Sequence, residues 1–387
     1  MTVTVSKYTL AGAAIVLALS TAPPSMAANS VAFQIDAAHD GRAKFKKNFK
    51  PPLALKWVRD LGGAVSYPLI AKNMVFVTVV DPDGGTFLRA LSLATGDTVW
   101  HRHIDGSHAT NIAYDQGKVF AENAFGLLQA FDADHGKLIW GHQFTDQSIF
   151  PAPPTARKGM VFVAGIGEGG TLYAVSENNG NTIWSNQVFG NGYGAAAFAD
   201  DSVYYGYDCS FFKFFAGNGN LDWNNNGTCN DGGNDTALFY RDRLYGKSSM
   251  NSYIALDSGD GSKVGGFSGE STAATFWRNA DGGDFAMSIV DGELVSTALS
   301  TGERAWTFSG DGRLVSAPIT INGYVATGSS SGNVYLVKAE DGSQAWTANV
   351  GAPLEAEVGG SAPLPGLGAG QNMLVVPATN LLAAYGK

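Results

Sequence analysis

Three histidines come nearest to a metal-binding pattern. His101 and His103 are two positions apart, so on a β-strand they lie on the same face, and His108 follows shortly after. Three imidazoles could bind zinc if the chain after His103 folds back. A strand edge with polar residues facing water explains the same residues without a metal, and we favour that interpretation.

Residues 224–235, "NNNGTCNDGGND", could hold calcium, because Asn and Asp oxygens on a flexible loop are suitable ligands. Their spacing matches no EF-hand, and the loop-forming tendencies of Asn, Asp and Gly explain the same composition. "DPDGG" (81–85) and "DSGDGS" (257–262) are likewise expected to be turns. We therefore expect no bound metal, with calcium as the alternative.

Catalytic signatures are missing from the sequence. It contains no Gly-x-Ser-x-Gly elbow, phosphate-binding loop, Cys-x-x-Cys site or recognisable Ser-His-Asp grouping. Acidic residues are too common on its turns to nominate a pair for glycosidase chemistry. No catalytic residue is predicted.

The sequence contains a recurring repeat, and any functional residues must be held in place by the structure that it forms. "LRALSLATGDTVW" (88–100), "LLQAFDADHGKLIW" (127–140), "LYAVSENNGNTIW" (172–184) and "VYLVKAEDGSQAW" (334–346) share a strand, a tight turn and a second strand. The turn glycine recurs at intervals of 39–44 residues and is followed four positions later by tryptophan, except where Gly265 replaces it. The glycines are Gly96, Gly136, Gly180, Gly219, Gly261, Gly302 and Gly342, and the tryptophans are Trp100, Trp140, Trp184, Trp223, Trp306 and Trp346, with Trp57 before the first repeat.

This period and strand-length alternation predict a β-propeller with one four-stranded antiparallel sheet per repeat. Glycine suits the positive φ of a hairpin turn, and tryptophan can cover the gap to the next blade. "LALKW" (53–57) matches the strand after the turn, and "LLAAYGK" (381–387) matches the strand before it. The two ends should therefore complete one blade, which gives a closed, eight-bladed, all-β propeller over residues 53–387.

The phrase Ala-x-Asp-x-x-x-Gly-x-x-x-Trp, clearest from Ala130 to Trp140, resembles the repeat of pyrroloquinoline-quinone-like β-propellers. "AHDGRAKF" (38–45) resembles the entry segment that often precedes their first blade. That superfamily includes quinoprotein dehydrogenases and non-enzymatic members such as the lipoprotein scaffold of the outer-membrane β-barrel assembly machine. The resemblance implies the propeller fold and favours the secreted, non-dehydrogenase kind.

Features of the dehydrogenases are missing here. Their cofactor sits beneath a disulfide of adjacent cysteines, whereas Cys209 and Cys229 are 20 positions apart. Their longer chains supply calcium ligands and a catalytic Asp, and some add a haem site. We therefore expect no cofactor, with pyrroloquinoline quinone or calcium as the alternative. A bound quinone would need a tryptophan or an acidic residue near the axis, and only Trp277 and Asp235 lie outside the repeat pattern near the start of an inner strand.

The fourth and fifth repeats depart most from the pattern. Cys209 and Cys229 flank a hairpin there and are expected to form a disulfide in an exported protein. In the sixth repeat, Phe276, Trp277 and Arg278 align with small residues such as Ala152, Gly194 and Ser316. Such side chains are common at binding hot spots, so they and Asp235 form the candidate binding site. Alternatively, Trp277 fills the gap left by Gly265.

Residues 1–27 resemble a cleaved export signal, with Lys7, the apolar run "LAGAAIVLAL" and Ser25-Met26-Ala27. No cysteine stands near the cut, so we expect a periplasmic or secreted protein without a lipid anchor or membrane span. The net charge of −9 disfavours a nucleic-acid partner. The basic stretch 41–50 is expected to belong to a solvated arm covering residues 28–52, with contact to an anionic surface as the alternative.

These features favour a non-enzymatic, monomeric scaffold whose loops or axial funnel bind a protein or an envelope polymer. The alternative is a quinoprotein-like dehydrogenase or a carbohydrate-active enzyme that uses the funnel.

Overall fold

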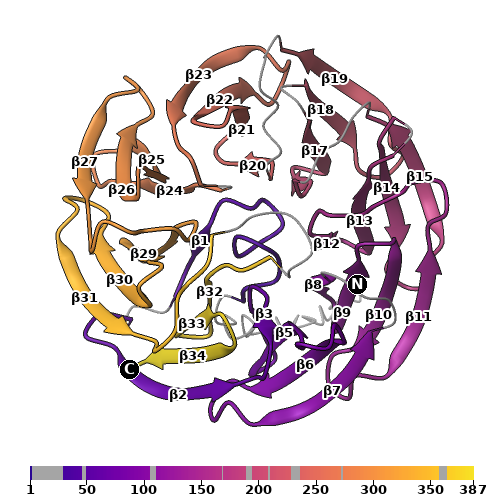
Figure 1. Cartoon of the computed structure of the whole chain (residues 1–387). Coiled ribbons are helices and arrows are strands. Elements are labelled where there is room, and N and C mark those ends of the chain that lie inside the picture. The colour runs from indigo at the N-terminus through magenta and orange to yellow at the C-terminus, as the bar shows by residue number, and fades with distance from the viewer. Residues whose placement is uncertain are drawn as a thin grey trace.

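A computed structural model describes residues 1, 29–45, 49–104, 110–167, 169–188, 194–207, 210–227, 236–271, 273–356 and 364–387. These residues form eight antiparallel sheets arranged as blades around a central axis (Figure 1). We number the blades 1 to 8 in chain order from residue 64. The predicted eight-bladed, all-β propeller is confirmed, and the described residues contain no helix that could cross a membrane.

The first strand of each blade lies nearest the axis and the last lies at the rim (Figure 1). Blade 1 contains β3 (Ala64–Val65), β4 (Leu69–Ala71), β5 (Met74–Val80), β6 (Thr86–Ser92) and β7 (Thr98–Ile104). Blade 2 contains β8 (Thr110–Asp115), β9 (Lys118–Asn123), β10 (Leu127–Asp132) and β11 (Leu138–Gln143). Blade 3 contains β12 (Thr155–Arg157), β13 (Met160–Gly165), β14 (Thr171–Ser176) and β15 (Thr182–Gln187). Blade 4 contains β16 (Ala197–Ala199), β17 (Ser202–Tyr207), β18 (Ser210–Phe215) and β19 (Leu221–Asn226).

The second half of the ring repeats this order. Blade 5 contains β20 (Leu238–Phe239), β21 (Arg243–Ser249), β22 (Ser252–Asp257) and β23 (Lys263–Ser268). Blade 6 contains β24 (Thr275–Arg278), β25 (Asp284–Val290), β26 (Glu293–Ala298) and β27 (Arg304–Phe308). Blade 7 contains β28 (Ile319–Ile321), β29 (Tyr324–Gly328), β30 (Asn333–Lys338) and β31 (Gln344–Asn349), with β1 (Arg42–Ala43) parallel to β28. Blade 8 contains β32 (Gly368–Gly370), β33 (Met373–Ala378), β34 (Leu381–Gly386) and β2 (Ala54–Asp60).

Adjacent blades are joined by what we call the tryptophan lock. Gly136, in the turn between β10 and β11, has a left-handed φ of 64°, and a Cβ added there would lie 2.6 Å from the Trp100 indole of blade 1. Glycine is thus required both by the turn and by the indole that covers it. The Trp100 Nε1–H also donates a hydrogen bond to the carbonyl oxygen of Ala133, at 3.0 Å.

Seven of the eight interfaces carry this indole-to-carbonyl bond, with N···O distances of 2.7–3.1 Å. The pairs are Trp57 with Leu93, Trp100 with Ala133, Trp140 with Glu177, Trp184 with Ala216, Trp223 with Ser258, Trp306 with Ala339 and Trp346 with Leu53. The predicted role of the tryptophans in covering the gaps between blades is confirmed.

The ring closes as the terminal half-repeats predict. β2 pairs antiparallel with β34, and Trp57 lies opposite Ala384 although the two are far apart in sequence. The Trp57 side chain is buried and locks blade 8 to blade 1. The N-terminal strand therefore completes the last blade and leaves no open interface at the chain ends.

Residues 30–43, which we call the axial segment, run across the centre of the ring. Their bonds to the first strands are Ser30 with Ile70 of blade 1, Val31 with Tyr114 of blade 2, His39 with Thr155 of blade 3, Ala37 with Phe198 of blade 4, Ala38 with Phe239 of blade 5, and Gly41 with Thr275 of blade 6 and Thr320 of blade 7. Ile35 packs in one cluster with Leu367 before blade 8. The prediction of a solvated arm is wrong for these residues, because their backbone groups satisfy inner strand edges that face the axis.

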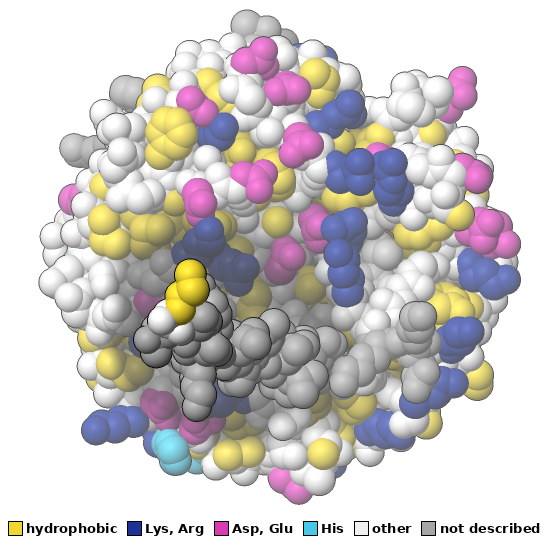
Figure 2. Space-filling model, turned by 180° about the vertical axis from the view of Figure 1, so that it is seen from behind, with side chains coloured by type: hydrophobic (Ala, Val, Ile, Leu, Met, Phe, Trp, Pro, Cys, Tyr) yellow, Lys and Arg dark blue, Asp and Glu magenta, His cyan; other side chains and the backbone are white. Residues whose placement is uncertain are grey.

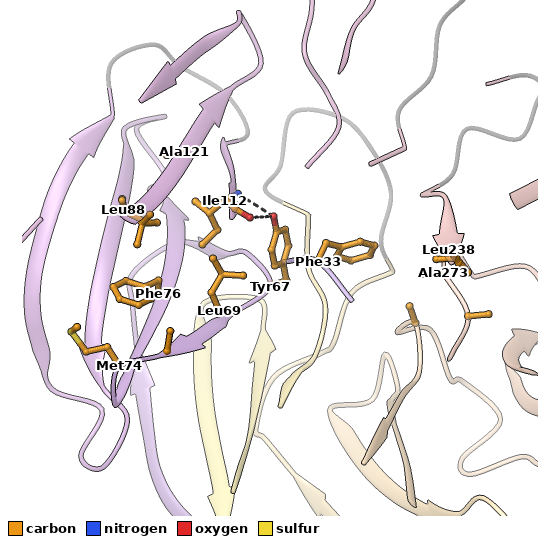
Figure 3. Packing of buried hydrophobic residues seen from close by; sticks show 14 of the residues in the cluster. Phe33, Tyr67, Leu69, Met74, Phe76, Leu88, Ile112, Ala121, Leu238 and Ala273 are labelled. Carbon is orange, nitrogen blue, oxygen red and sulfur yellow. Dashed lines mark hydrogen bonds between the residues drawn. The ribbon is translucent and has the colours of Figure 1, made fainter. Parts of the chain in front are cut away.

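Aromatic packing anchors the axial segment in the core. Phe33 contacts Tyr67 edge-on, with ring centroids 5.4 Å apart. Figure 3 shows the Phe33 ring beside Tyr67, on the side toward Leu238 and Ala273 of the opposite blades. The Tyr67 hydroxyl donates a hydrogen bond to the carbonyl of Ile112, which ties blade 1 to blade 2. One hydrophobic cluster thus spans the axis.

Candidate binding surface around the sixth blade

The predicted binding residues divide between described and undescribed parts of the chain. Phe276, Trp277 and Arg278 end β24, the innermost strand of blade 6. Asp235, Cys209 and Cys229 lie outside the described residues, so the disulfide stays a prediction, as does most of the loop considered for calcium. The site is therefore built from blade 6 and its neighbours.

Phe276 faces blade 5 and belongs to the core. It is fully buried, and its ring stacks on Tyr240 with centroids 4.6 Å apart and planes within 5°. The predicted alignment of Phe276 was wrong, because the turn from β24 to β25 spans residues 279–283, whereas the turns after most other first strands have two residues. In the observed register Phe276 matches Phe198 and Phe239, and also Ala156 of blade 3 and Ala369 of blade 8, in place of the predicted Ala152, Gly194 and Ser316.

Trp277 points to the opposite side of the strand because side chains alternate along it. It packs on Phe285, with ring centroids 5.5 Å apart, and against the cluster shared by blades 6 and 7. Trp277 therefore does not fill the gap left by Gly265, which lies between blades 5 and 6. One alternative from the sequence is thereby excluded.

A groove of about 620 Å³ opens beside Trp277. We call it the arm groove, because its other wall is the chain that leaves the axial segment; its lining residues are Phe45, Phe49, Lys50, Trp277, Asn322, Gly323, Tyr324, Lys338 and Glu340. Two hydrogen bonds between the Asn322 side chain and the Phe45 backbone, at 2.9 and 3.0 Å, hold this wall in place. The groove combines aromatic walls with a rim of Lys50, Lys338 and Glu340, which are exposed.

Arg278 takes part in a charged cluster on the other flank of blade 6. Asp284 accepts hydrogen bonds from the Tyr240 hydroxyl and from Arg278, both at 2.7 Å, and lies 3.4 Å from Arg241. The Arg42 guanidinium stacks over the Tyr240 ring, 4.7 Å from its centroid. Burial, followed by the bond to Asp284, raises the pKa of Tyr240, so the phenol stays neutral and holds blades 5 and 6 together.

A second hollow, of about 320 Å³, lies at the interface between blades 5 and 6, where the tryptophan is missing. We call it the slot; its lining residues are Tyr240, Arg241, Asp242, Arg243, Tyr245, Gly282, Gly283, Asp284, Leu299 and Ser300. Figure 2, seen from behind, shows the outline of the molecule indented at the upper right, where blades 5 and 6 meet, with Lys and Arg side chains beside the indentation. The slot is thus a polar-rimmed opening between two blades.

Two titratable groups of the axial segment, the partly buried Asp36 and the fully buried His39, have shifted pKa values. Burial, reinforced by nearby Asp40, raises the pKa of Asp36 to about 7. Burial lowers the pKa of His39 to about 4, and its ring nitrogens lie 2.7 Å from the Phe33 carbonyl and 2.9 Å from the Thr155 hydroxyl. A neutral His39 therefore fixes the segment to blade 3 at physiological pH.

His101 and His103 lie exposed on β7, with ring centroids 6.3 and 5.3 Å from that of Phe87 on β6. His108 is outside the described residues, so a zinc site including it stays untested. Residues 81–85 and 257–262 form the predicted turns, in which Asp81 accepts a hydrogen bond from the Gly85 N–H and Asp257 accepts one from the Gly259 N–H.

Comparison with known proteins decides the family. A family model described as outer membrane protein assembly factor BamB matches residues 84–298 and 290–386. The chain belongs to this family. The predicted resemblance to quinoprotein-type propellers is confirmed, and no curated protein matches the sequence.

Solved structures share the fold of this BamB-family chain at low identity. BamB from Moraxella catarrhalis is 18% identical, with a TM-score of 0.67, over 87% of this chain and 100% of that one. The quinohemoprotein alcohol dehydrogenase from Comamonas testosteroni is 12% identical, with a TM-score of 0.74, over 93% and 80%. A europium-containing methanol dehydrogenase is 14% identical, with a TM-score of 0.70, over 93% and 98%. These likenesses establish the propeller and leave the function open.

The sequence interpretation missed the axial segment and the slot. Gly265 was a visible signal for the slot, because it is the one break in the tryptophan series. The axial segment offered only "AHDGRAKF", which indicates an entry to the first blade and not a path across the ring.

Proposed function

We propose that this BamB-family protein is an exported, non-enzymatic scaffold that binds a protein partner on the surface around blade 6. The observation that carries the proposal is the filled axis: the axial segment bonds to first strands of blades 1 to 7 and packs beside blade 8. An enzyme that used the funnel would need open space there. The chain's own backbone occupies that space instead.

The fold family also includes cofactor-dependent dehydrogenases, so the fit of an axial cofactor needs testing against this chain. Phe33, Ile35 and His39 are almost completely buried at the centre, where they hold the ring together. Residues committed to such packing do not fit a group bound on the axis. We therefore propose that the protein acts without a quinone.

The arm groove has the character of a protein-binding site. Trp277 and Tyr324 offer large, rigid apolar surfaces, and both side chains are only partly buried. Lys50, Lys338 and Glu340 at the rim can form charge-assisted hydrogen bonds. Aromatic anchors within a polar rim are the usual anatomy of an interface hot spot. A partner in the cell envelope would fit the family and the expected export signal.

Site-specific crosslinking in intact cells tests this proposal. A photoreactive amino acid at Glu340 should crosslink one partner polypeptide, and the additional change Trp277→Ala should reduce that crosslink by at least about tenfold, as expected for a hot spot. The same amino acid at exposed Val99, on the outer strand of blade 1, is the control site.

The stability of Trp277→Ala must be measured alongside. A crosslink that survives Trp277→Ala, or that is equally strong from position 99, would contradict the proposed surface. Loss of the crosslink with an unchanged melting temperature would support it, whereas loss accompanied by unfolding at the assay temperature would assign Trp277 to packing and count against the proposal.

A further inference from the structure

The interface between blades 5 and 6 keeps the parts of a tryptophan lock but lacks the indole. In six of the seven locks, all except that of Trp346 with Leu53, the accepting carbonyl stands three residues before the turn glycine, as Ala133 does before Gly136. In blade 6 the corresponding residues are Leu299 and Gly302. Gly265 occupies the place of the tryptophan, opposite Ala255 in the sheet, as Trp100 lies opposite Ala90.

Among the described residues, no side chain comes within 4 Å of a Cβ added at Gly265 or Gly302. A Cβ added at Gly302 would meet only the Gly266 carbonyl oxygen, at 4.0 Å, whereas at Gly342 it would lie 2.8 Å from Trp306. A Cβ added at Gly265 would meet no atom within 4 Å. Among the described residues, no other donor takes the place of the indole N–H at the Leu299 carbonyl.

The aromatic wall of the lock is also retained. In blades 1 to 4 the second strand carries an aromatic ring that packs on the tryptophan, with centroids 5.9–6.2 Å apart, in the pairs Phe76 with Trp100, Phe120 with Trp140, Phe162 with Trp184 and Tyr204 with Trp223. Tyr245 holds this position in blade 5 and lines the slot. Phe267, which lies on the same face of β23 as Gly265, packs on Tyr245 with ring centroids 6.0 Å apart, and Phe276 of blade 6 packs on it at 4.7 Å. A hollow of about 320 Å³ remains beside these rings.

We propose that the slot receives a tryptophan side chain from a protein partner, whose indole would stack beside Tyr245 and donate its N–H to the Leu299 carbonyl. The seven indoles of this chain are the template, since they occupy equivalent places at the other interfaces. Arg241, Arg243 and Asp242 at the mouth can bind polar groups flanking the tryptophan. The inference rests on the proposed protein-binding function, but its test does not require the partner.

The probe is N-acetyl-L-tryptophanamide, and its binding is measured by saturation-transfer NMR on the whole protein. We expect saturable binding, with N-acetyl-L-phenylalaninamide, which lacks the ring N–H, binding at least about fivefold more weakly. Gly265→Trp should abolish binding by supplying the missing indole from within. Ser300→Phe closes the slot from the opposite wall and should do the same, which covers the case that Gly265→Trp fails to fold.

Two further variants calibrate the measurement. Val264→Trp places a tryptophan on the neighbouring exposed position of β23 and should leave probe binding unchanged. Trp140→Gly vacates a regular lock and should add a second binding site. Probe binding that persists in both Gly265→Trp and Ser300→Phe would overturn the inference. So would a result in which the Trp140→Gly variant binds the probe and the native protein does not. If the probe binds but no crosslink forms at the arm groove, the inference that the slot binds tryptophan stands, and only the proposal that the arm groove binds a protein is contradicted.

Discussion

The interface between blades 2 and 3 and the interface between blades 5 and 6 are built from the same repeat but are closed differently. In the first, Trp140 covers Gly180 and donates to the Glu177 carbonyl at 2.9 Å. In the second, Gly265 leaves Gly302 and Leu299 uncovered. Both interfaces keep the turn glycine and an aromatic ring on the second strand, Phe120 in blade 2 and Tyr245 in blade 5. They differ in the lost indole and in the longer turn 279–283, whose residues line the slot.

This difference indicates that closing the ring does not require all eight locks. Blades 5 and 6 are held instead by the stacked Tyr240 and Phe276 rings and by the bonds that converge on Asp284. These contacts lie closer to the axis than the indole position, on the first strands and their turns. The outer part of the interface is thus released from packing and available for a ligand.

Removal of residues 28–60 should have the largest effect. It deletes the axial segment, β2 and the Trp57 lock, leaves β34 as an open edge and exposes the inner strands. We expect loss of cooperative folding, measured by circular dichroism during thermal unfolding, with the single change Trp57→Ala as a milder comparison. A truncated protein that melted at the native temperature would disprove the closure.

Trp140→Ala should strongly destabilise a regular interface. It removes an indole that contacts Phe120 and the Gly180 turn, and large-to-small changes of this kind cost about 3–5 kcal/mol. Denaturant unfolding measures the loss. A loss of less than about 1 kcal/mol in the free energy of unfolding would mean that the indole contributes little to the stability of this interface. It would contradict the distinction drawn between the closed and open interfaces.

Asp36→Asn should change how stability depends on pH. The pKa of Asp36 is raised to about 7 from its ordinary 3.8, so the folded state binds the proton more tightly and Asp36 makes stability fall as the pH rises between these values. His39, with its pKa lowered to about 4, acts in the opposite sense, so stability rises with pH up to about 6.5. In native protein the two slopes oppose each other.

The variant should therefore gain stability relative to native protein as the pH rises from about 4 to 7, and the difference should level off above that. Unfolding in urea at a series of pH values measures it, with the exposed Glu303→Gln as the control. A constant difference across this range would show that Asp36 titrates normally and that the axial segment is not buried as described.

The sequence predicted the ring and its closure because the evidence for them is local. Each turn glycine and its tryptophan are four residues apart, and their recurrence gives the blade count. The path of the axial segment could not be predicted, since its partners extend from Ile70 to Thr320 and none shares a periodic pattern with it. Phe276 was misaligned because the lengthened turn at 279–283 shifts the register of β24.

The slot illustrates a different limit. The loss of tryptophan at Gly265 was evident from the sequence, but another side chain could have filled the space, and Trp277 was one candidate. Only the opposite orientations of Phe276 and Trp277 on β24 decide which interface each side chain enters. Side-chain packing between non-adjacent strands is not encoded in any short pattern.

The most direct test of the vacant slot compares Gly302→Ala with Gly342→Ala. Both glycines hold the same turn position, with φ of 73° and 72°, so each substitution imposes the same left-handed strain, about 1–2 kcal/mol. At Gly342 the new methyl must also displace the Trp306 ring, at 2.8 Å, which adds about 1–3 kcal/mol, whereas at Gly302 it enters open space. We predict that urea unfolding will show Gly342→Ala to be the more destabilising by about 1–3 kcal/mol. Equal losses would contradict the claim that the interface between blades 5 and 6 is unfilled.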